Sequence, residues 1–257
     1  MVYMAYNQRS LFVTGVWTTV QLALAGTAIA FVLALLMVFL RIQEPDKRDN
    51  DFVKFLKIVA NKFSRFYIFV IRGTPMMVQS LIFYYAIFNL FKRTGMSVTE
   101  INRVWSLFIS GLVTVSLNST AYLAEVLRGG ILAVDAGQME AARSLGMTHW
   151  QAMRKVVFPQ AIKNSLPAIG NEFIINIKDS SVLCVLGVSD LMFMTRSVAG
   201  IYYKGTECYL IAATVYLFLT YLSSLLLKTI TGRMTAPDNT KRRQGNQTVD
   251  LGLPSSN

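Results

Sequence analysis

Long apolar runs separated by short polar segments dominate the chain. The first run, residues 10–40, contains no Asp, Glu, Lys or Arg. A helix needs about 20 predominantly apolar residues to cross the hydrocarbon core of a bilayer, and it satisfies all its backbone hydrogen bonds there within one segment. The sequence therefore predicts an all-α membrane protein. It excludes soluble enzymes, secreted disulfide domains and disordered proteins.

The pattern predicts five transmembrane helices. They cover residues 10–40, 66–91, 104–124, 166–188 and 208–227. The first is too long for the apolar core of a signal peptide, so we interpret it as a span that is retained. The second carries Arg72, and Gly73 and Pro75 are expected to kink it. The fourth is interrupted by ionisable side chains.

The distribution of basic residues predicts the orientation of these spans. The segments 41–65 and 125–163, together with the chain from Lys228 onward, hold 17 Lys and Arg, whereas the alternate segments hold six. Cytoplasmic loops of membrane proteins carry the excess of Lys and Arg. We therefore expect the N-terminus outside and the C-terminus inside, which is the parity that five spans require.

Composition agrees with a membrane protein and adds little chemistry. Hydrophobic residues make up 53% and charged residues 15%, against about 25% charged in an average soluble domain. The net charge of +11 does not predict nucleic-acid binding, because no basic patch is interleaved with aromatic residues for base stacking. Cys184 and Cys208 lack the spacing of a metal site, so we expect free, buried thiols.

Two further segments differ from the spans. Residues 51–62 place Phe52, Phe55, Leu56 and Val59 at helical spacing with lysines between them. This pattern is typical of a helix that lies on the inner membrane surface. Residues 236–257 are polar and rich in Pro, Asn and Ser, which predicts a disordered cytoplasmic tail.

The segment 137–160 carries the most distinctive local signals. Gly146 is expected to end a short helix, because glycine accepts the left-handed conformation of a C-cap. Thr148 and Gln151 stand at the spacing of a capping box and start a second short helix. Pro159 is expected to stop that helix. The prediction is two short helices at a sharp angle on the cytoplasmic face.

This segment resembles the EAA loop of ABC importer permeases. The shared features are Glu140-Ala141-Ala142, a glycine after three further residues, and the end Pro159-Gln160-Ala161. Other runs are similar to the polar amino-acid branch of that superfamily. They are Arg72-Gly73-Thr74-Pro75 with Val78-Gln79, the run 122–131, Asn171-Glu172, and Lys178-Asp179-Ser180-Ser181. The resemblance covers residues 10 to 230, although the charged first cytoplasmic loop and the basic tail depart from the family pattern.

The resemblance implies a type I ABC importer permease in a bacterial cell membrane, surrounded by lipid and working by alternating access. The chain contains no Gly-Lys dipeptide, so it lacks a P-loop and is not itself an enzyme. ATP and Mg would be used by a separate ABC ATPase dimer. A second permease subunit, identical or related, and an extracytoplasmic amino-acid-binding protein would complete the importer. The expected ATPase-coupling residues are Glu140, Ala141, Ala142, Gly146, Trp150 and Pro159.

Ionisable residues at membrane depth are costly and mark functional sites. Glu172 and Asp179 are seven residues apart, so they share one helix face, with Asn176 between them and Ser180 beyond. Such a stripe suits the ammonium of an amino acid, and we predict that it binds substrate. The alternative is a salt bridge of either acid with Lys178 or Arg72 that holds helices together.

The sequence allows two roles for each of two arginines. Arg72 is a candidate to capture a substrate carboxylate if its span starts near Phe66. It is an inner-surface residue if the span starts at Gly73. Arg128 stands three residues after Glu125, which predicts either an intrahelical pair or a contact at a gate.

Three rival functions remain open from the sequence. An importer of another small solute, such as an opine or a small peptide, is the closest. An ion channel would show a filter or a charged ring and no coupling loop, and a membrane scaffold would need no charged stripe at depth. His149 is the one histidine, and no Ser-His-Asp grouping accompanies it, so we expect a surface residue and not a catalyst.

Overall fold

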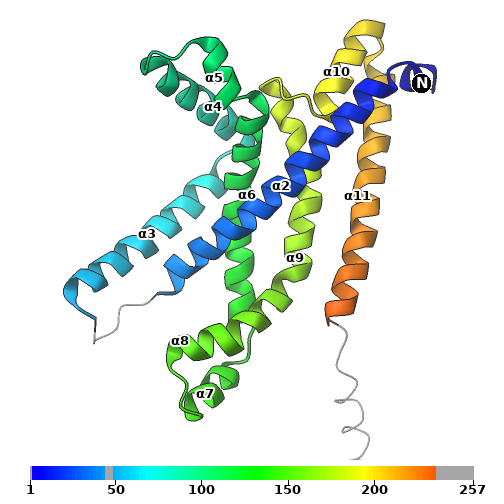
Figure 1. Cartoon of the computed structure of the whole chain (residues 1–257). Coiled ribbons are helices and arrows are strands. Elements are labelled where there is room, and N and C mark those ends of the chain that lie inside the picture. The colour runs from blue at the N-terminus through cyan, green and yellow to red at the C-terminus, as the bar shows by residue number, and fades with distance from the viewer. Residues whose placement is uncertain (1, 44–48, 236–257) are drawn as a thin grey trace, which may run out of the picture.

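The computed structural model describes residues 2–43 and 49–235, and in these ranges the chain forms helices and no strand (Figure 1). The predicted tail 236–257 lies outside the described residues. The elements are α1 (Val2–Asn7), α2 (Arg9–Ile42), α3 (Asp51–Gly73), α4 (Met76–Arg93), α5 (Val98–Val104), α6 (Leu107–Leu132), α7 (Ala136–Ser144), α8 (His149–Ala152), a π-helical turn (Met153–Val157), α9 (Phe158–Asp179), a 3-10 turn (Ser180–Val185), α10 (Leu191–Tyr202) and α11 (Gly205–Thr235).

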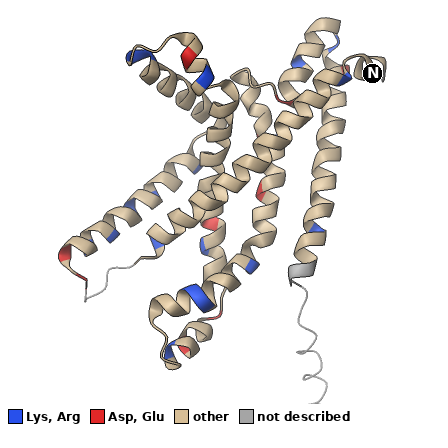
Figure 2. Ribbon diagram, viewed as in Figure 1, with Lys and Arg blue, Asp and Glu red and all other residues tan. Residues whose placement is uncertain are grey.

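Three described helices, α2, α6 and α11, are long and apolar enough to cross a membrane. A fourth span results if α3 and α4, which meet at an angle of 113°, form one broken span. Helix α9 packs against α2, α6 and α11 but is not among the helices that are apolar enough by the same test. The five-span topology and its orientation therefore remain predictions. Figure 2 shows charged residues at the two ends of the molecule and along α3, with others between the ends on α6, α9 and α11.

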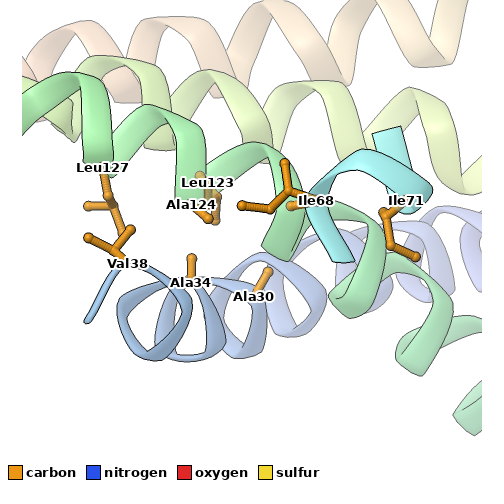
Figure 3. Close-up of a cluster of buried hydrophobic side chains, with 9 residues drawn as sticks. Ala30, Ala34, Val38, Ile68, Ile71, Leu123, Ala124 and Leu127 are labelled. Atoms are coloured by element: carbon orange, nitrogen blue, oxygen red, sulfur yellow. The ribbon is translucent and has the colours of Figure 1, made fainter. Parts of the chain in front are cut away.

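The core is built where α2 crosses α6, with α3 against both. Small residues on α2 allow the two long helices to approach closely. A Cβ atom added to Gly26 would lie only 2.6 Å from Cγ1 of Val115 on α6. The buried cluster at this crossing comprises Ala30, Ala34, Val38, Ile68, Ile71, Ala121, Leu123, Ala124 and Leu127 (Figure 3).

The predicted surface helix 51–62 is the first half of α3, which continues without interruption to Gly73. Its polar side faces α2. Asn61 donates a hydrogen bond from Nδ2 to the carbonyl of Arg41 at 2.9 Å, and Ser64 donates from Oγ to the carbonyl of Met37 at 3.1 Å. Its aromatic side points away from the chain, where Phe52 is 72% exposed.

The expected kink of the second span is a complete break. Helix α3 ends at Gly73, Thr74 is extended, and α4 starts after Pro75. Proline fits this place because its missing N–H is not required at the start of a helix. The range 66–91 therefore contains two helices with different directions.

The corner between α7 and α8 has the predicted geometry. Gly146 has φ +83°, and the capping box of Thr148 and Gln151 is formed. The expected stop at Pro159 is wrong, because the chain stays helical from His149 through Pro159 to the end of α9. The N–H of Phe158 bonds to the carbonyl of Met153, five residues back. This wider π turn relieves the clash that a proline makes with an ordinary α-helical turn before it.

Candidate translocation site and coupling segment

Helix α9 carries the predicted substrate-binding stripe. Glu172, Asn176 and Ser180 are buried, whereas Asp179 is exposed. Glu172 and Asp179 are seven residues apart and therefore share this helix face, two turns from each other. The structure thus places the stripe partly inside the helix packing and partly at its surface. An acidic pair of this kind can attract a cationic group that approaches the exposed end.

Asn176 joins three helices. Its Oδ1 accepts a hydrogen bond from Ser119 Oγ of α6 at 2.9 Å, and its Nδ2 donates to Thr27 Oγ1 of α2 at 2.9 Å. Thr27 in turn donates to the carbonyl of Ala23 at 2.7 Å. Both ends of the carboxamide are therefore used within the chain. Asn176 fixes the helix that carries Glu172, and sequence reasoning missed its partners on α2 and α6.

The salt bridges that were the alternative reading of the stripe are not formed among the described residues. The ion pairs there join other groups, namely Arg41 with Glu125, Arg128 with Glu125, Lys54 with Asp51, and Lys57 with Asp49. Glu172 and Asp179 thus have no arginine or lysine within salt-bridge distance in the described part of the chain. This leaves the buried carboxylate of Glu172 without a cationic partner.

Glu125 has the partner that its spacing predicted and a second one. Arg128 Nε lies 3.0 Å from Glu125 Oε2, which is an intrahelical pair on α6. Arg41, in the last turn of α2, also donates to this carboxylate. The contact of Arg41 with Glu125 joins the end of α2 to α6 on the side of the molecule where α7 and α8 lie.

The structure places Arg72 at the break between α3 and α4. It lies in the last turn of α3, at the break, where the helix dipole favours a cation. Its guanidinium carbon is 5.3 Å from the ring centroid of Tyr122 on α6. Because its side chain is exposed, it remains accessible to a ligand.

The coupling segment forms one end of the molecule, at the bottom of Figure 1. Among its predicted residues, Glu140, Ala141, Gly146, Trp150 and Pro159 are exposed. Ala142 is buried within the segment. These exposed positions form a surface available to another protein.

One contact ties this surface to a long helix. The Trp150 ring packs edge-on against Phe39 of α2, with ring centroids 5.6 Å apart. Helix α8 continues through the π turn into α9, so the surface is also covalently linked to the helix of Glu172. A displacement of α8 would therefore act on α2 and α9 together.

A buried acid outside the predicted spans was not anticipated. Asp190 is fully buried at the N-cap of α10, where its Oδ1 accepts a hydrogen bond from the Phe193 N–H at 2.9 Å. Its Oδ2 has no hydrogen-bond partner among the described residues. Burial raises the pKa of Asp190 to about 6, because desolvation disfavours the charged form.

The comparison with known proteins decides the family. A family described as binding-protein-dependent transport system inner membrane component matches residues 50–236. The chain belongs to this family. It is thus a membrane permease, and the EAA resemblance, the all-α fold class and the transport role are confirmed.

Named relatives of the permease cover most of its length. The glutamine transport system permease protein GlnP of Escherichia coli (strain K12) is 31% identical over 87% of this chain and 93% of its own. The probable amino-acid permease protein YxeN of Bacillus subtilis (strain 168) is 37% identical over 71% of this chain and 78% of its own. The nopaline transport system permease protein NocM of Agrobacterium fabrum is 30% identical over 82% of each.

Solved structures agree with this assignment. A crystal structure of an amino acid ABC transporter with histidines matches the permease with a TM-score of 0.73 and 38% identity, over 89% of this chain and 96% of that one. The methionine transporter MetNI in an inward-facing conformation matches with a TM-score of 0.68 at 20% identity, over 88% and 96%. This second match shows a shared fold only.

Proposed function

We propose that the permease imports a polar amino acid as the transmembrane subunit of an ATP-driven ABC importer. The observation that carries the proposal is the carboxylate of Glu172, which is buried in α9 without a cationic partner among the described residues. An unpaired ionisable group inside a membrane costs about 2.5 kcal/mol or more. Binding of a substrate ammonium would explain why the permease carries such a group. Relatives named for glutamine and amino-acid transport support the substrate class.

The substrate path runs along the exposed part of the α9 stripe. Asp179 receives the substrate ammonium first, and Glu172 attracts it inward. Asn176 orients α9, and Ser180 extends the polar face. Arg72, exposed at the end of α3, is the candidate for the substrate carboxylate, since a planar guanidinium can bind both oxygens.

A partner ATPase supplies the energy for transport. An ABC ATPase dimer binds ATP and Mg and docks on the surface of α7 and α8. Its closure moves α8, and the continuous helix transmits the movement to α9. A second permease subunit completes the pathway, and an extracytoplasmic binding protein delivers the amino acid to it in the bacterial plasma membrane.

An opine is the second candidate substrate, because the relative NocM is named for nopaline transport. An opine is an N-substituted amino acid, with a secondary ammonium and more than one carboxylate, so the stripe could serve both. Competition separates the two candidates.

The test is uptake of radiolabelled glutamine into proteoliposomes that contain the assembled complex with ATP on the ATPase side. We expect accumulation that requires ATP and the binding protein, and competition by unlabelled polar amino acids. Competition by nopaline alone would favour the opine. Flux that persists without ATP and follows the membrane potential would indicate a channel and refute the proposal.

A further inference from the structure

The break between α3 and α4 leaves backbone carbonyl groups without partners in their own helix. The last carbonyls of a helix have no partner within that helix, and the hydrocarbon core offers no water to replace one. Here α3 stops at Gly73 and α4 leaves at 113° to it. The carbonyls of Ile71 and Thr74 at this break need donors from elsewhere in the chain.

Gln79 supplies these donors from the second turn of α4. Its Nε2 lies 2.7 Å from the carbonyl oxygen of Ile71 and 2.9 Å from that of Thr74. The same nitrogen is 2.8 Å from Thr74 Oγ1, which itself donates to the carbonyl of Val70 at 2.9 Å. The side chain is 4% exposed. One carboxamide on α4 thus caps the end of α3 and fixes the angle between the two helices.

The other end of the same carboxamide reaches a third helix. Asn118 of α6 donates from Nδ2 to Gln79 Oε1 at 2.9 Å. The next residue, Ser119, donates the hydrogen bond to Asn176 of α9, which lies one turn after Glu172. Two adjacent residues of α6 therefore connect the break with the helix of the acidic stripe.

We propose that Gln79 is a positioning residue for transport, which holds the α3–α4 break at one angle and ties that angle to α6 through Asn118. The inference rests on the proposed function. A positioning role of Gln79 would explain the residues from Arg72 to Gln79 together. Pro75 makes the break, Thr74 offers two oxygens to it, and Gln79 closes it.

Two substitutions separate the two halves of this arrangement. Gln79→Glu keeps the size of the side chain and an oxygen for Asn118, but replaces the amide donor that faces two carbonyls. Asn118→Leu keeps the cap on α3 and removes the link to α6. Ser80→Ala is the matched control, because Ser80 is equally buried and bonds only within α4, to the carbonyl of Met77.

The experiment compares these variants in the assembled complex. We expect Gln79→Glu and Asn118→Leu each to lower ATP-driven uptake by about tenfold or more, since each leaves buried polar groups unpaired. Complex yield should stay close to that of Ser80→Ala. The double variant should be no worse than the poorer single one, because both act on one connection.

A distance measurement gives a readout that does not depend on transport. Spin labels at the exposed positions Leu90 on α4 and Leu132 on α6, in a variant with Cys184 and Cys208 replaced by serine, should show a broader distance distribution with Gln79→Glu. Unchanged distances, or uptake equal to Ser80→Ala, would overturn the inference. A fall in uptake that only matches a fall in yield would also overturn it. If the unsubstituted permease takes up no amino acid, the proposed function fails, and the label distances still test the cap.

Discussion

Gly146→Val perturbs the corner between α7 and α8 without touching any neighbour. A Cβ at Gly146 would meet nothing within 4 Å, so packing adds no cost. The cost is conformational, because φ is +83°. The left-handed region costs about 1–2 kcal/mol for a residue with a Cβ, and a β-branched side chain is stiffer still. A cost of about 2 kcal/mol lowers the population of the native corner about thirtyfold relative to its alternatives.

The expected result is an uncoupled permease. Transport and substrate-stimulated ATPase activity of the reconstituted complex should fall, while the amount of inserted permease stays the same. Gly146→Asn is the matched control, since asparagine tolerates the left-handed conformation and should retain most of the activity. Normal uptake by Gly146→Val would refute the claim that this corner positions the ATPase-docking surface.

Three further predictions address packing, pH and topology. Gly130→Val should abolish assembly, measured as complex yield, because its Cβ would lie 2.6 Å from a backbone oxygen of α9; Gly129→Val, with open space around it, should assemble normally. Asp190→Asn should flatten the pH dependence of thermal unfolding between pH 4 and 7. Because the pKa of Asp190 is higher in the folded permease, its protonation adds stability that is fully present below the ordinary pKa of 3.8 and is lost as the pH rises through about 6. An unfolding temperature with the same pH dependence in Asp190→Asn would contradict this. A reporter fused after Lys228 should report the cytoplasm and one near Thr94 the outside, and finding both on one side would overturn the five-span topology.

The sequence predicted those features that local signals encode. Gly146 and the pair Thr148 and Gln151 specify a helix end and a helix start within six residues, and the corner has that form. Pro159 gave a wrong prediction for a related reason. A proline stops a helix because its ring clashes with an ordinary α-helical turn before it. The wider π turn before Pro159 avoids that clash, so the helix continues.

Contacts between distant segments could not be predicted in this way. Asn176 meets Thr27, 149 residues away, and Ser119, 57 residues away, and no spacing rule pairs them. Single Thr and Ser residues in an apolar run resemble ordinary helix-packing residues. The sharpness of the break at Pro75 likewise depends on Gln79, whose role emerges only once α3, α4 and α6 are placed together.

In the proposed mechanism, substrate moves along the acidic stripe of α9. Uptake and basal ATPase activity, measured on the same proteoliposomes for Glu172→Gln and Asp179→Asn, test this movement. We expect reduced amino-acid uptake with an unchanged basal ATPase rate and unchanged complex yield. Unchanged uptake by both variants, or a loss of uptake that only follows a loss of assembled complex, would contradict it.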